Sequence, residues 1–224
     1  MGELHVRGRA DAWLQPGRAV LDVHVTASDP HSQHAAVEDL AELCAVVDDV
    51  VNERRNGPQG LVRRVVVSSI TSTEDVEHGP GGTRRRTGFS ATRTSVLDCR
   101  ADADGLTGLV GALAHDGVRV HGPRWHVNDD DPAWVGVRTA AVTDARRRAE
   151  AYAMAVDGHV GAVRWISEPG LRGGAPDAVP RPHVAAARLA SAGGHEAGEA
   201  RAVRIAVEPV QVTVAVEAAF DLRP

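Results

Sequence analysis

The sequence predicts an α+β fold in which three helices cover one face of a curved, mainly antiparallel sheet, in the order β-β-α-β-β-α-β-α-β-β. Several runs alternate apolar and polar residues, three other runs repeat apolar residues every three or four positions, and turns containing Gly or Pro separate them. With 224 residues and 43% hydrophobic content, the chain can bury a sizeable core, so we expect a single domain over 1–224.

The first two strands are predicted at about 3–13 and 18–28. Gln15-Pro16-Gly17 between them is a turn signal, so we expect these two strands to form a hairpin. Asp29-Pro30 then breaks the second strand, and a helix is predicted at about 31–55. This helix is indicated by apolar residues that share one helical face, namely Leu40, Leu43, Cys44, Val47, Val50 and Val51.

A second pair of strands is predicted at about 61–77 and 84–100, joined by a Gly- and Pro-containing loop at 78–82. In the later strand one face is mostly apolar and the other mostly polar, which is typical of an antiparallel sheet with one side in water. The arginines at 84–86 open this strand. We expect them to form a solvated edge or a guard against strand pairing.

A short helix is predicted at about 102–115, followed by a strand at about 118–127. Asp131-Pro132 then starts a longer helix that runs to about Val156, with the carboxylate at the N-cap and the proline at the first helical position. The four charged residues between 146 and 150 form its solvated face. Its alanine-rich apolar stripe, which favours a close approach to the sheet, is Val137, Ala141, Ala145, Ala149 (or Tyr152) and Val156.

The C-terminal part of the chain begins with a strand predicted at about 160–167. Residues 168–202 are irregular and rich in Pro and Gly, so we expect a flexible loop or insertion there. The final strand, from about 203 to 222, alternates on odd positions and then on even positions. Because a slip of one residue reverses the two faces of a strand, the change at Glu208-Pro209 predicts a bulge or a break.

The composition argues against several classes of protein. All 25 basic residues are arginine, but the net charge of −5 makes nucleic-acid binding an unfavoured function. No apolar run approaches the roughly 18 residues of a membrane-spanning helix. The first residues have neither the basic region, the apolar region nor the cleavage site of a signal peptide, so we expect a cytoplasmic location.

Eleven histidines raise the question of a metal site. His24, His31 and His34 are close in sequence and are the weak candidates for metal ligands, since His31 and His34 are three residues apart at a helix start. No carboxylate spacing or HExxH pattern completes the group, and no phosphate-binding loop or GxSxG pattern is present. We therefore predict no catalytic residue, no cofactor and no metal, and expect the histidines to be exposed or hydrogen-bonded.

The predicted order of elements and several sequence segments resemble the SIMPL family (DUF541). The most specific similarity is Ala140–Ala149, which resembles that family's A-x-x-D-A-[RK]-x-[RK]-A block. The segments 6–10 and 16–25 look like its first hairpin. The resemblance covers nearly the whole chain, because similar segments also occur at 87–91, 159–168 and 212–222.

The resemblance implies a role in assembly or interaction. Members of the family have no established catalytic centre, some form ring- or channel-like oligomers, and some are linked to oxidative stress. We therefore expect a non-enzymatic, stress-related protein that forms a homo-oligomer through its sheet edges and its long final strand.

The residues leave two other functions open. The alternative is a metal-binding or small-molecule-dependent enzyme or sensor that uses a histidine cluster. Redox sensing by Cys44 and Cys99 is a third option, although neither cysteine has CxxC or metal-ligand spacing. We expect both cysteines to be buried free thiols that pack as small apolar side chains.

Overall fold

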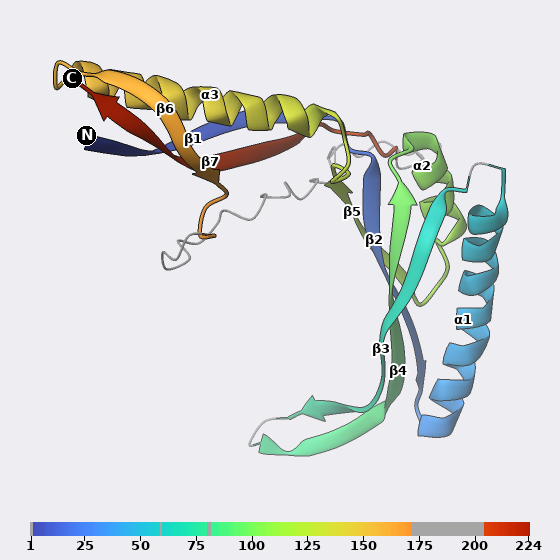
Figure 1. Cartoon of the computed structure of the whole chain (residues 1–224). Coiled ribbons are helices and arrows are strands. Elements are labelled where there is room, and N and C mark those ends of the chain that lie inside the picture. The colour runs from blue at the N-terminus through green and yellow to red at the C-terminus, as the bar shows by residue number, and fades with distance from the viewer. Residues whose placement is uncertain (1, 59, 80–81, 172–203) are drawn as a thin grey trace, which may run out of the picture. The chain divides into compact units, whose positions relative to one another are not determined.

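A computed structural model of the chain describes residues 2–58, 60–79, 82–171 and 204–224. These residues form an α+β fold with three helices, as predicted, and the predicted order of elements is confirmed (Figure 1). The strands form two antiparallel sheets. The chain divides into two compact units. Among the described residues, the first unit comprises 2–15, 127–171 and 209–224, and the second comprises the rest.

The first unit is a three-stranded sheet with one long helix on it. The helix α3 contacts all three strands, and Figure 1 shows it lying along the sheet. The strand order is β1-β7-β6, with every neighbouring pair antiparallel. The elements are β1 (Gly2–Leu14), α3 (Ala133–Met154), β6 (His159–Ser167) and β7 (Val210–Arg223).

The close contact between α3 and β1 depends on small side chains. Gly8 lies directly under the helix, and a Cβ atom placed on it would come within 2.1 Å of the Ala141 carbonyl oxygen. Ala141, Ala145 and Ala149 are fully buried against this sheet, together with larger residues such as Phe220. The predicted alanine stripe is therefore confirmed as far as residue 149.

The second unit is a four-stranded antiparallel sheet in the order β3-β4-β2-β5. Helix α1 packs on the sheet face formed by odd-numbered residues of β2 and β4, such as Val23 and Leu97, which are buried. Ser32 caps this helix by accepting a hydrogen bond from the Ala35 N–H. The elements are β2 (Arg18–Asp29), α1 (Gln33–Asn56), β3 (Val62–His78), β4 (Arg84–Arg100), α2 (Ala103–Ala112) and β5 (Val118–His126).

The structure corrects the pairing of the first two strands. The predicted hairpin of 3–13 with 18–28 is wrong, because β1 pairs with β7 over thirteen residues, whereas β2 pairs with β4 and β5. The two strands belong to different units, so the turn at Gln15–Gly17 carries the chain from one unit to the other. As a result, the expected single sheet is two sheets. The single domain over 1–224 stays a prediction.

Two element boundaries and the buried face of one helical turn differ from those expected. Helix α3 begins at Ala133, although the Asp131 carboxylate still accepts a hydrogen bond from the Ala133 N–H at 2.8 Å. In the last turn of α3, the apolar stripe continues from Ala149 to Ala153, four residues on, and Ala153 is buried. Tyr152, the predicted alternative to Ala149, is instead 61% exposed. The final strand, predicted from about 203, begins only at Val210, directly after Glu208-Pro209; residues 204–209 are not in a strand. Of the expected loop, 172–202 lies outside the described residues.

Candidate functional site

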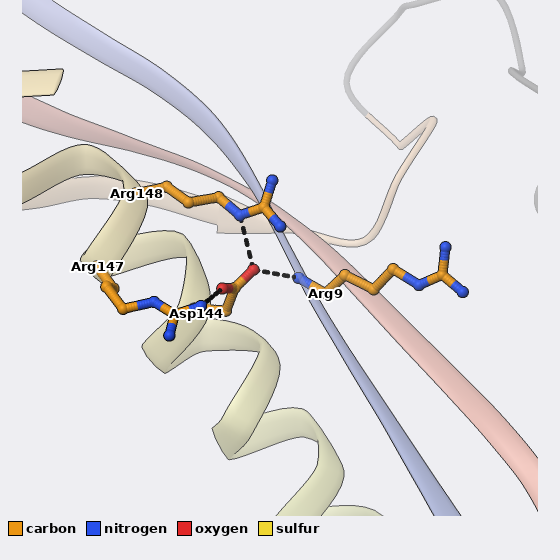
Figure 2. A network of polar contacts seen from close by, with 4 residues as sticks. All are labelled: Arg9, Asp144, Arg147 and Arg148. Atoms are coloured by element: carbon orange, nitrogen blue, oxygen red, sulfur yellow. Dashed lines mark hydrogen bonds and ion pairs between the residues drawn. The ribbon is translucent and has the colours of Figure 1, made fainter. Parts of the chain in front are cut away.

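Asp144 joins α3 to the first strand of its sheet. Its carboxylate accepts a hydrogen bond from the Arg9 backbone N–H at 3.0 Å and is paired with Arg147 at 2.6 Å and Arg148 at 2.8 Å (Figure 2). Only 10% of the Asp144 side chain is exposed. We call these four residues the Asp144 cluster.

The geometry of helix and sheet explains how the Asp144 cluster forms. Residues three and four positions apart lie on the same side of a helix, which brings Arg147 and Arg148 to Asp144. Because β1 is an edge strand, alternate backbone N–H groups point away from β7, and Arg9 supplies one of these to Asp144. The Arg9 N–H, followed by the Arg147 guanidinium, holds the pKa of Asp144 below its usual value.

An open hollow of about 570 Å³ lies beside the Asp144 cluster. Two carboxylates and two guanidinium groups line it, and Asp11 is itself bonded to Arg9 and Thr213. The lining contains threonine hydroxyls but no histidine or cysteine, and its two carboxylates, Asp11 and Asp144, are already bonded to arginines. Its chemistry therefore suits holding helix and strand together. The lining residues are Arg9, Ala10, Asp11, Gly136, Thr139, Ala140, Thr143, Asp144 and Arg147.

The three candidate histidines occupy different settings. His24 lies on β2, and its ring and that of His121 are arranged edge to face with their centroids 5.2 Å apart. The Nδ1 atom of His24 is 3.2 Å from the Thr94 hydroxyl. His31 and His34 are exposed at the start of α1, and His34 faces Glu38 at 3.2 Å. Within the described ranges, no three His, Cys, Asp or Glu side chains are grouped so that they could hold a metal ion.

Both cysteines are buried free thiols, as predicted. Burial raises the pKa of Cys99 to about 12 and also raises the pKa of Cys44. A thiol reacts as its thiolate, so these two groups are poorly suited to redox sensing at neutral pH.

The edge of β3 is the most open strand edge of the second unit. β3 lies at the end of its sheet, and most of its residues are exposed. Three large apolar side chains are among them: Val66 is 40% exposed, Val67 50% and Ile70 69%. Sequence reasoning placed these residues on a strand but did not identify an edge. The signal was present, because 65–73 contains no charged residue, proline or glycine.

The far end of β3 continues beyond the rest of its sheet. The last residues of β2 and β4 to pair are Asp29 and Phe89, while β3 and β4 pair onward to His78 and Arg84. This two-stranded end is seen in Figure 1 as a hairpin that bends away from the other strands of the sheet. The arginines at 84–86 are exposed here, opposite an acidic stretch of β3 that includes Glu77.

The family is decided by a comparison with protein-family models. The SIMPL model, described as a protein of unknown function (DUF541), matches residues 4–220, which include both units. The chain belongs to the SIMPL family. The resemblance seen in the sequence is therefore confirmed, and Asp144 and Gly8 both lie in segments that carried it.

Solved structures give only weak likenesses to this SIMPL chain. An amidase of the hydantoinase/carbamoylase family from Burkholderia phymatum is 12% identical with a TM-score of 0.25, covering 51% of this chain and 31% of that one. A putative amidohydrolase/peptidase from Burkholderia cenocepacia is 20% identical with a TM-score of 0.26, covering 62% of this chain and 34% of that one. The SIMPL chain thus spans about a third of each of these proteins, and TM-scores this low support no inference about activity.

Two further findings concern the SIMPL chain. No protein with a curated description matches it. None of the helices in the described part of the chain is long and apolar enough to cross a membrane.

Proposed function

We propose that this SIMPL chain is a non-enzymatic protein that assembles with copies of itself through the edges of its sheets. The observation that carries the proposal is the outer edge of β3, with which no strand pairs in the part of the chain that the structure describes and which presents exposed apolar side chains. An unpaired strand edge is a template for pairing with another chain. The hollow beside the Asp144 cluster offers no comparable basis for a reaction, because its lining has no activated nucleophile.

One part of the expected assembly does not fit the topology. The long final strand, β7, lies in the middle of its sheet, where β1 and β6 occupy both of its edges. Because neither edge of β7 is free, it cannot pair with a second copy while the sheet is intact. The assembly is therefore assigned to edge strands and not to the final strand.

Light scattering coupled to size-exclusion chromatography tests the proposal. We expect a mass that is a multiple of the 23.6 kDa chain at micromolar concentrations. A monodisperse monomer throughout a titration to several hundred micromolar would contradict it. The stress-related role and the cytoplasmic location stay predictions, which survival of a deletion strain under oxidant and cell fractionation would test.

A further inference from the structure

We infer that β3 is the strand through which two copies of this chain associate, pairing antiparallel with β3 of the second copy about a two-fold axis near Ser69. This inference rests on the proposed function and names the surface that it uses. The partner is a second copy because the two ends of β3 carry opposite charges. Arg63 and Arg64 form its basic end, and Glu74, Asp75 and Glu77 form its acidic end.

The charge pattern makes β3 complementary to itself only when the two copies run in opposite directions. In an antiparallel pair centred near Ser69, the basic end of each strand lies opposite the acidic end of the other. A parallel pair in register would place like charges together at both ends, which is unfavourable. Arg63, Arg64, Glu74 and Glu77 are exposed in the structure. Glu74 also lies 3.9 Å from Arg84 of β4 and Glu77 is opposite Arg85, so a partner's arginines would share these carboxylates with β4.

The middle of β3 suits a strand–strand contact. Residues 65–73 consist only of Val, Ile, Thr and Ser, of which Val, Ile and Thr strongly favour extended backbone. From Ser69 to Asp75 the strand keeps a regular register with β4 over seven residues. Bulges occur at Val67/Ser69 and near both ends of the strand. The regular stretch lies on one side of the proposed axis, and the Val67/Ser69 bulge lies next to that axis, so an added strand would have to follow this bulge.

The other three edge strands among the described residues are protected in ways that β3 is not. Along β1, α3 lies close over Gly8, and Asp144 takes the outward N–H of Arg9. β5 contains Pro123, which has no backbone N–H to donate to an added strand. β6 has nine residues and shifts register twice, so its longest regular stretch against β7 is three residues.

A pair of charge-reversal variants tests the inference. R63E/R64E makes both ends of β3 acidic, and E74R/E77R turns its acidic end mainly basic while keeping the Asp75–Ser90 hydrogen bond. Each variant alone should dissociate about tenfold or more readily than the wild type, since like charges then meet at the interface. An equimolar mixture should recover a complex that contains one copy of each, which native mass spectrometry resolves by mass.

Controls separate the possible results. R119E changes an exposed residue on the β5 edge of the same sheet and should leave the association unchanged. I70K changes the most exposed apolar residue of β3 and should weaken association without reversing any charge. It replaces E74R/E77R as the test if circular dichroism shows that variant to be unfolded. A wild-type monomer would overturn both this inference and the proposed function. A wild-type oligomer that persists in folded I70K and R63E/R64E would overturn the β3 interface alone.

Discussion

The contact between Gly8 and α3 gives the sharpest test of how the first unit is held together. In Gly8→Ala the new Cβ would lie 2.1 Å from the Ala141 carbonyl oxygen, 2.5 Å from the Ala145 nitrogen and 2.8 Å from the Ala145 Cβ. Two of these three atoms belong to the helix backbone, so no rotamer change relieves the clash. Restoring an ordinary distance of 3.4 Å to the carbonyl oxygen moves helix and strand apart by about 1.3 Å.

The expected cost of Gly8→Ala follows from two opposing effects. Alanine in an extended strand would by itself stabilise the fold by roughly 0.4–1 kcal/mol, because the unfolded chain loses freedom. Overpacking a close-packed contact costs about 1–3 kcal/mol, and more where backbone must move. Because the shift opens a contact lined by the fully buried Ala141 and Ala145, we expect overpacking to dominate. The net loss of unfolding free energy should be about 2 kcal/mol, or roughly 4–8 °C in Tm.

Thermal unfolding followed by circular dichroism measures this effect. Gly136→Ala is the matched control, because Gly136 is an exposed residue of the same helix and an added Cβ meets nothing within 4 Å. This control should gain about 0.5–1 kcal/mol from helix propensity. If Gly8→Ala were as stable as the wild type or more so, the close packing of α3 on β1 would be refuted.

Three further predictions concern single side chains. The lowered pKa of Asp144 contributes stability that is fully present above its ordinary value of 3.8 and is lost as the pH falls through the folded value. In thermal melts from about pH 5 to pH 2, the Tm of Asp144→Asn should therefore fall less steeply with pH than that of the wild type. An equally steep fall in both proteins would contradict this role. Asp48→Ala removes both hydrogen bonds to the buried Arg93 and should lower the unfolding free energy by about 1–3 kcal/mol in urea titrations, whereas wild-type stability would show that the pair is dispensable. Cys44 and Cys99 should react with a thiol reagent only after denaturation, so rapid modification of the native protein would show that they are accessible.

The sequence predicts the type and order of the elements well because both are encoded locally. Spacing of three and four identifies α1 through residues such as Leu40 and Val47, and alternation identifies β4 through Ala91 and Leu97. The partners of each strand are not encoded in this way. Gln15-Pro16-Gly17 has the composition of a hairpin turn, but β1 finds its partner in β7, at the far end of the chain.

The candidate site shows the same division between local and long-range information. The block that contains Asp144 is recognisable in the sequence, but its contact with Arg9 joins residues 135 positions apart. The predicted solvated face of α3 is confirmed for Arg147 and Arg148, whose charged ends turn to Asp144. The edge position of β3 depends on the order of strands in the sheet, which alternation alone does not reveal.

The pairing of β1 with β7 has a consequence for how the protein is made. Strand β1 is synthesised before β2 to β6, whereas β7, the strand that pairs with it, is synthesised after them. At about 5–20 residues per second, the roughly 200 residues between the two strands take some 10–40 seconds to translate. Throughout that interval Val6 and its neighbours on β1 cannot pair with β7, so the first unit is completed only after β7 has been synthesised.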